Sequence, residues 1–360
     1  MIIYFVVLAH FALYLLFYKW ADRQKKTIFL LVSFICIFII YGLRNQTVGI
    51  DTVSYMKYFD LYAGYSLKDL IIGNSWFRRL DPAFIVLAKA VSLLGLDFNA
   101  YITITGVIYS IIFIALLFRI NSYDRYKFAY LFFSLYFVCS GLNIMRQAFA
   151  TLILLHAFLC FQQKKWKNTI ILCVISSLFH AGAIIVCSLL LVYMIFGRTS
   201  NKAKLVKYLS VVGLVSIVFI YQFVFKLFGL EIYSSSEKAD VSIYNIVALI
   251  FLYLIYIYKK SLNKSDAYNY CSAFIETSII ASVVCCVLGG VSVGFIRITT
   301  IIFPFSIFAL LDSINGYCKI NKNILVMEIS FYIFSLIYFC HSITSNIGGV
   351  VPFEFMWSKV

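Results

Sequence analysis

The sequence predicts an all-α, polytopic membrane protein, and three observations carry this prediction. Hydrophobic residues make up 63% of the 360 residues and charged residues only 12%, whereas soluble globular chains are about 25% charged. Apolar runs that approach the length of a bilayer span recur along the chain, without the short alternating segments of a membrane β-barrel. The charged residues gather between these runs, as they do in the loops of helical membrane proteins.

The apolar runs predict about twelve transmembrane segments. The candidate spans are residues 2–18, 27–43, 100–118, 128–142, 147–161, 168–180, 181–197, 208–228, 243–258, 269–289, 296–311 and 323–340. The segment 81–96 is short and carries Lys89 in its middle, so we expect an interfacial or re-entrant helix there. We therefore expect a single integral membrane domain over 1–360, in which 44–99 form a long outer loop.

The basic residues predict the orientation of the spans. The formal net charge is +15, and most basic residues, Lys165 among them, fall in loops on one side of the predicted membrane. Because basic loops stay in the cytoplasm, the opposite side, with Asp51 and Arg146, is expected to face the periplasm. Loop lysines and arginines explain the positive charge without nucleic acid, and we expect no nucleic-acid partner.

No metal or nucleotide site is predicted. The 10 cysteines include no CxxC pair, and most lie in apolar runs, where cysteine behaves as a small hydrophobe. The sequence has no HExxH, Walker A, GxSxG or Gly-rich nucleotide motif. We expect a protein that uses no cofactor.

A polar stretch begins where the second apolar run ends, RNQTVGIDTVSYMKYF, residues 44–59. Gly49 allows a turn that other residues resist. A short helix is expected to follow it, with Asp51 as the N-cap and with Thr52 and Tyr55 in the first turns. We expect binding or chemistry in this loop.

Three roles are open for Asp51: helix cap, ion-pair partner of Arg44, or general base. Its position after a glycine at a helix start favours the cap, and Arg44 is the nearest cation in the loop. We favour a cap or an ion pair over direct proton transfer.

Two arginines stand at the mouths of apolar runs, Arg146 in IMRQAFA and Arg297 in GFIRITTIIFP. Arginine at such a depth is costly and commonly faces a polar cavity or a partner, although a snorkelling or salt-bridged structural arginine is the alternative. Acidic residues near them are few and lie in one loop. An anionic ligand is therefore favoured, and the guanidinium fork suits phosphate.

His180 lies in SSLFHAGAII, flanked by small residues that allow close helix approach. Two readings are open. The histidine is either hydrogen-bonded within a helix contact, or it acts as a phosphate ligand or proton carrier.

These motifs together resemble one family. LRNQTVGIDTVSYMKYF resembles the opening motif of the EpsG-like, Wzy-type polysaccharide polymerases, in which Arg is followed by Gly-x-Asp-Thr-x-x-Tyr. IMRQAFA resembles the second Arg motif of that family, FHAGAII its His motif and GFIRITTIIFP its late Arg motif. The resemblance covers most of the chain in the same order. It implies a GT-C-like helical bundle in the bacterial inner membrane, with the active site facing the periplasm.

The resemblance also implies a reaction, in which a glycan moves from undecaprenyl pyrophosphate to a lipid-linked repeat unit. Its partners would be the lipid-linked donor and acceptor, membrane lipids and a polysaccharide chain-length regulator. The residues expected to bind pyrophosphate are Arg44, Arg146 and Arg297; the catalytic candidates are Asp51 and His180; the supporting residues are Thr52, Tyr55 and Gln147.

Two other function classes fit part of the pattern. A flippase for lipid-linked oligosaccharide would share the spans and the basic cavity, but such transporters commonly show two related halves, and the sequence has no such halves. A membrane O-acyltransferase would need a histidine near an acyl donor and would leave Arg146 and Arg297 without a role. We therefore favour the polymerase.

Overall fold

A computed structural model describes residues 2–17, 23–66, 68–70, 81–121, 141–197, 199–227 and 270–288, most of 295–308, and parts of 246–257 and 333–357. Within these residues the regular structure is helical, apart from an isolated antiparallel bridge between Arg44 and Phe355. The predicted all-α class is therefore confirmed. The predicted spans 128–142 and 323–340 lie mostly outside the described residues, so the number of about twelve spans stays a prediction.

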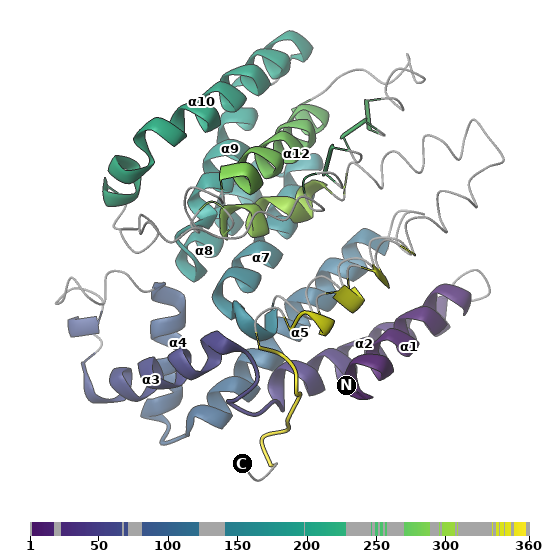
Figure 1. Ribbon diagram of the computed structural model, residues 1–360, viewed down its shortest axis with the longest axis vertical. Helices are drawn as coiled ribbons and strands as arrows, with labels where there is room; N and C mark the ends of the chain where they lie inside the picture. The colour runs from purple at the N-terminus through teal and green to yellow at the C-terminus, as the bar shows by residue number, and fades with distance from the viewer. Residues whose placement is uncertain are drawn as a thin grey trace. The chain divides into compact units, whose positions relative to one another are not determined.

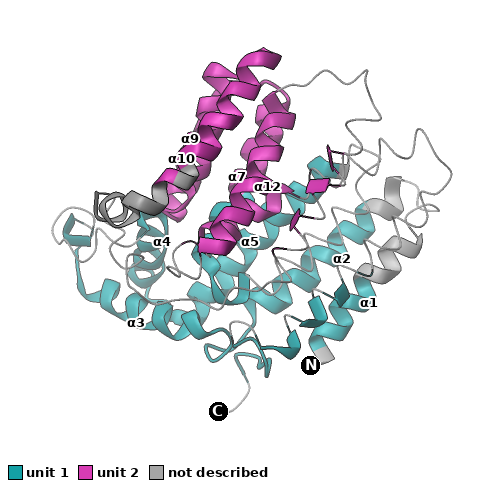
Figure 2. Cartoon of the chain, turned by 45° about the horizontal axis from the view of Figure 1, so that its top comes forward, with its two compact units in different colours: residues 1–152, 325–360 teal, residues 153–324 magenta. Residues whose placement is uncertain are grey.

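The chain forms two compact units, coloured teal and magenta in Figure 2. Unit 1 comprises Met1–Leu152 and Leu325–Val360, and unit 2 comprises Ile153–Ile324. The boundary falls within one helix, α7 (Met145–Gln162). The single membrane domain expected over 1–360 stays a prediction.

Unit 1 begins with two apolar helices and continues through the predicted outer loop. Its helices are α1 (Ile2–Phe17), α2 (Arg23–Gly42), α3 (Ile50–Gly64), α4 (Pro82–Leu93) and α5 (Phe98–Asn121), followed by the start of α7. Helices α2 and α5 pack side by side (Figure 1). Their backbones meet at glycines, since a Cβ added to Gly106 would lie 2.4 Å from the Cα of Gly42. Small residues allow this close approach in membrane helices.

Helix α4 packs against α3 and α5. It has 12 residues, about 18 Å, which is less than the ~30 Å of a bilayer core. Lys89 on this helix is buried, and its Nζ donates a hydrogen bond to the carbonyl oxygen of Ala63 at 3.0 Å. That carbonyl belongs to the last turn of α3, where the helix dipole favours a cation. The placement of α4 at the outer membrane surface stays a prediction.

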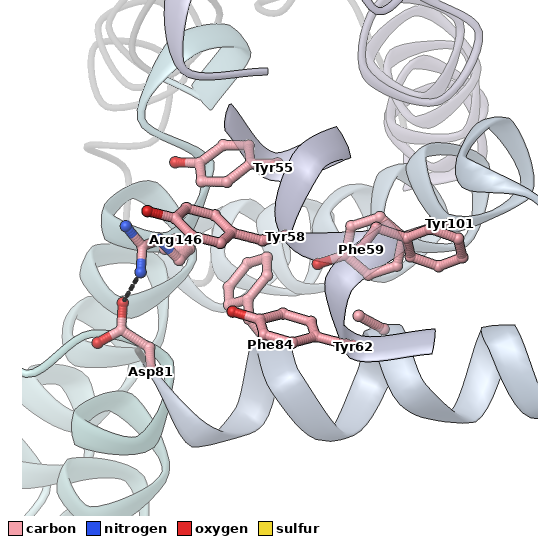
Figure 3. A pocket seen from close by; sticks show the side chains of 9 residues that line it. Tyr55, Tyr58, Phe59, Tyr62, Asp81, Phe84, Tyr101 and Arg146 are labelled. Atoms are coloured by element: carbon pink, nitrogen blue, oxygen red, sulfur yellow. Dashed lines mark ion pairs between the residues drawn. The ribbon is translucent and has the colours of Figure 1, made fainter. Parts of the chain in front are cut away.

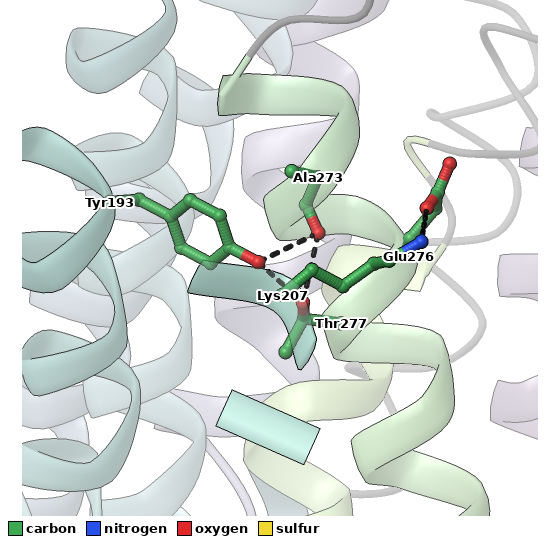
Figure 4. Close-up of polar contacts among 5 residues, drawn as sticks. All are labelled: Tyr193, Lys207, Ala273, Glu276 and Thr277. Carbon is green, nitrogen blue, oxygen red and sulfur yellow. Dashed lines mark hydrogen bonds and ion pairs between the residues drawn. The ribbon is translucent and has the colours of Figure 1, made fainter. Parts of the chain in front are cut away.

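Unit 2 contains the rest of α7, followed by α8 (Trp166–Phe179), α9 (Ala183–Phe196), α10 (Ser200–Leu227) and α12 (Tyr270–Leu288). Polar contacts join three of these helices (Figure 4). Lys207 of α10 pairs with Glu276 of α12 at 2.8 Å, and the hydroxyl of Tyr193 of α9 lies 2.6 Å from that of Thr277. A charged side chain from which water is excluded is usually paired with an opposite charge, as Lys207 is with Glu276.

Within the described residues, three helices are long and apolar enough to cross a membrane: Phe98–Ile120, Met145–Gln162 and Tyr270–Leu288. Shorter apolar helices accompany them in both units. Large apolar side chains such as Ile111, Phe118 and Val174 are exposed on these helices. In water such exposure would be costly, whereas lipid tails cover it without cost. The class of helical membrane protein is confirmed.

Candidate functional site

The loop between α2 and α3 carries the side chain of Arg44 into the interior of unit 1, where it is only 1% exposed. Residues near the C-terminus hold this loop in place. The backbone N–H of Asn45 donates to the carbonyl of Glu354 at 2.8 Å, and the N–H of Met356 donates to the carbonyl of Leu43 at 3.0 Å. These bonds flank the bridge between Arg44 and Phe355.

The guanidinium of Arg44 is poorly satisfied. Its Nη2 lies 3.8 Å from the Sδ of Met145, a weak acceptor, while Nε and Nη1 are buried without a hydrogen-bond partner. No described residue forms an ion pair with it. Burial lowers the pKa of Arg44 to about 10, and nearby tyrosines partly oppose this effect. The group is thus still a cation at neutral pH, and an uncompensated buried cation is costly.

The turn at Gly49 fits no other residue. Its φ is +91°, and an added Cβ would lie 2.3 Å from the carbonyl oxygen of Leu142. Helix α3 begins directly after it, and the backbone N–H of Asp51 donates to Oδ1 of Asn143 at 2.9 Å. The hydroxyl of Thr52 is buried and donates to the carbonyl of Val48 at 2.8 Å. The special turn predicted at Gly49 is confirmed.

Two roles predicted for Asp51 are wrong. The N-cap of α3 is Gly49, and Asp51 is the second residue of the helix. The amide of the first turn is instead capped by Asn143, which comes from a distant stretch of sequence. The expected ion pair with Arg44 is absent as well, since the Arg44 guanidinium contacts Met145. Asp51 is half-buried beside Tyr55, and its charge helps to raise the pKa of the Tyr55 hydroxyl.

Arg146, in the first turn of α7, forms an ion pair with Asp81 (Figure 3). Its Nη1 lies 3.0 Å from Oδ2 of Asp81, and its Cζ lies 5.5 Å from the centroid of the Tyr55 ring. Asp81 is the N-cap residue of α4, yet its side chain makes no capping hydrogen bond. The carboxylate of Asp81 forms the ion pair with Arg146 instead. Gln147, the next residue of α7, is buried.

The ion pair opens onto a pocket with mostly aromatic walls, here named the aromatic pocket (Figure 3). It is lined by Tyr55, Tyr58, Phe59, Tyr62, Asp81, Phe84, Ala88, Tyr101 and Arg146. The pocket is partly open to the outside. Burial is the main cause that raises the pKa of the Tyr55 and Tyr62 hydroxyls, so both stay protonated and can donate hydrogen bonds.

The other predicted site residues lie in unit 2. His180 follows α8 and is buried. Close to it, a Cβ added to Gly182 would lie 3.1 Å from both Nε2 of His180 and Cδ1 of Ile301. The histidine turn therefore packs against the helical segment that carries Arg297, whose side chain is exposed. Within unit 2, the His and late Arg motifs are neighbours.

Sequence reasoning missed several residues of this site. Asp81 precedes a proline at a helix start, which is the pattern of an ordinary N-cap. The residues around Asp81 in the sequence do not indicate that its carboxylate pairs with Arg146. Tyr101 and Phe84 belong to apolar runs and gave no polar signal. Asn143 precedes the second Arg motif by a short distance, and that proximity was the one available hint.

These observations define a helical membrane protein in which two arginine-bearing motifs meet beside an aromatic pocket. The family model of the EpsG family matches residues 27–355, nearly the whole chain, and the protein belongs to this family. The resemblance seen in the sequence is confirmed. Membership of the family indicates a membrane glycan polymerase of the glycosyltransferase kind. Comparisons with curated proteins and with solved structures gave no match.

Proposed function

We propose that the protein extends a polysaccharide by moving a glycan from undecaprenyl pyrophosphate to a lipid-linked repeat unit at the periplasmic face of the bacterial inner membrane. Family membership supports the polymerase part of this proposal. The observation that carries the lipid-pyrophosphate part is Arg44, a buried cation with no carboxylate partner among the described residues. A site that keeps such a charge at a cost in stability is suited to an anion.

The reaction requires one bond to form and one to break. A hydroxyl oxygen of the acceptor attacks the anomeric carbon of the donor sugar. The bond between that carbon and the pyrophosphate oxygen breaks, and its electron pair leaves with the lipid pyrophosphate. The hydroxyl proton passes to a base. Pyrophosphate is a good leaving group, so the enzyme's main task is to stabilise the charge that develops on it.

Arg44 is the proposed ligand of the leaving group, because a guanidinium can donate two parallel hydrogen bonds to phosphate oxygens. Arg297 is a second candidate ligand, being an exposed arginine beside the buried His180 turn. The fold would be GT-C-like, with a chain-length regulator as a partner.

Two residues remain candidates for the base. Asp51 is half-buried in the first turn of α3, and its charge acts on the Tyr55 hydroxyl. His180 is the second candidate.

Deletion of the gene tests the proposal in cells. Surface polysaccharide is separated on a gel from the deletion strain, and from the same strain complemented with wild type or with Arg44→Met. The proposal predicts a single-repeat band and no ladder in the deletion and Arg44→Met strains, and a full ladder with wild type. Loss of every surface repeat in the deletion strain would instead indicate a flippase.

A further inference from the structure

We propose that the aromatic pocket is a subsite for a neutral sugar ring, namely the non-reducing end of the acceptor. The proposal rests on the proposed function for the identity of the acceptor. It assigns Arg146 to the glycan, and leaves the pyrophosphate to Arg44.

The presence or absence of a carboxylate partner indicates which ligand each of the two arginines binds. Arg146 has its carboxylate, since Asp81 lies 3.0 Å away and is itself buried. The pair brings no net charge to the pocket, so a second anion would have to compete with Asp81 for the same guanidinium. Arg44 has no such partner among the described residues. The unpaired cation suits pyrophosphate, and the neutral pair suits a ligand that carries hydroxyls but no charge.

The shape of the walls suits a pyranose ring. Tyr58 and Tyr62 stack on one side of α3 with ring centroids 6.2 Å apart and an interplanar angle of 13°, and Phe84 of α4 belongs to the same lining. Flat aromatic faces pack well against the C–H face of a sugar, which is apolar. Tyr58 is only half-buried, so its ring is accessible to a ligand.

The polar groups of the pocket match sugar hydroxyls. The Asp81 carboxylate in the lining can accept hydrogen bonds, and the Arg146 guanidinium can donate them. The hydroxyls of Tyr55 and Tyr62 are protonated and can donate. Adjacent donors and acceptors of this kind bind vicinal hydroxyls in pairs.

The two ligands would lie next to each other, as the reaction needs. Tyr55 is electrostatically coupled to Arg44 and lies under the guanidinium of Arg146. Met145, which contacts Arg44, directly precedes Arg146 in α7. A sugar in the aromatic pocket is thus held beside the place proposed for the pyrophosphate, and its hydroxyl can approach the donor carbon.

Binding of the isolated glycan tests the subsite. The probe is the repeat-unit oligosaccharide, freed of lipid and phosphate, from the polysaccharide of the strain that carries the gene. The full chain is placed in lipid nanodiscs, because sugar-headed detergents would compete, and affinity is measured by calorimetry. We expect Tyr58→Leu and Asp81→Asn each to weaken binding at least tenfold. Tyr65→Leu, a change at an exposed tyrosine outside the pocket, should leave affinity unchanged.

Competition separates this proposal from the proposed function. We expect inorganic pyrophosphate to leave oligosaccharide affinity unchanged, and Arg44→Met to retain it. Wild-type affinity in both pocket variants would overturn the subsite, as would displacement of the oligosaccharide by pyrophosphate or no binding to the wild type. If the subsite holds but the deletion strain keeps its ladder, the polymerase proposal fails alone. If the ladder is lost but the pocket variants bind normally, the subsite fails alone.

Discussion

The guanidinium of Arg44 lies against the thioether of Met145, with Nη2 3.8 Å from Sδ. This contact joins the first two motifs of the sequence, which are 101 residues apart. Asn143 strengthens the connection by accepting a hydrogen bond from the amide of Asp51. The loop after α2 and the start of α7 therefore form one structure.

Gly49→Ala is expected to abolish the polymer and to lower the melting temperature. A residue other than glycine at φ +91° is strained by about 1 kcal/mol or more, and the new Cβ would meet the Leu142 carbonyl at 2.3 Å. The loop would have to move, and Arg44 with it. Gly64→Ala is the control, because nothing lies within 4 Å of a Cβ there; it should be neutral or slightly stabilising. Equal behaviour of the two variants would contradict the account.

Asp51→Asn separates proton transfer from a structural role. The N-cap is Gly49, so the amide should cost only the ~0.3–1 kcal/mol of a first-turn charge in the helix dipole. If Asp51 is the base, turnover should fall by about 10²–10⁴ at normal protein level. The measurement is polymer formed per unit of protein, with Asp60→Asn, an exposed change on the same helix, as the control. Near wild-type turnover in Asp51→Asn would move the base to His180.

Arg297→Ala is expected to remove the polymer without affecting stability, because the side chain is exposed. Arg297→Lys should rescue poorly, since an ammonium cannot make a forked contact with phosphate. Lys202→Ala, which removes an exposed cation from the same unit, should keep the full ladder. A full ladder in Arg297→Ala would exclude this residue from the site.

The sequence was informative wherever a local rule applied. Apolar runs predicted helices, and Gly49 predicted a turn, because helix and turn preferences are set by neighbouring residues. The partners of the charged side chains could not be predicted in this way. Asp81 has the local pattern of a helix cap, yet its carboxylate pairs with Arg146. Asp51 has the same pattern, yet the side chain that caps the first turn of α3 is that of Asn143. Such choices are made by segments that meet only in the folded protein.

The burial of Arg44 has a consequence for stability. Its pKa in the folded protein, about 10, lies below its ordinary value of 12.5. The unfolded chain therefore binds more protons between these values, and stability should rise with pH in that window. At neutral pH the charged group therefore destabilises the fold. A residue kept only for structure would not be expected to carry this cost.

The most direct test of the account is the melting temperature of Arg44→Met, measured beside its ability to restore the polysaccharide ladder. Methionine has a similar length and no charge, and replacing a buried charge by an apolar residue is often neutral or stabilising by about 1–4 kcal/mol. We predict an unchanged or higher melting temperature together with complete loss of the ladder. A lower melting temperature, or a full ladder, would contradict the claim that Arg44 is kept as a cation for an anionic substrate.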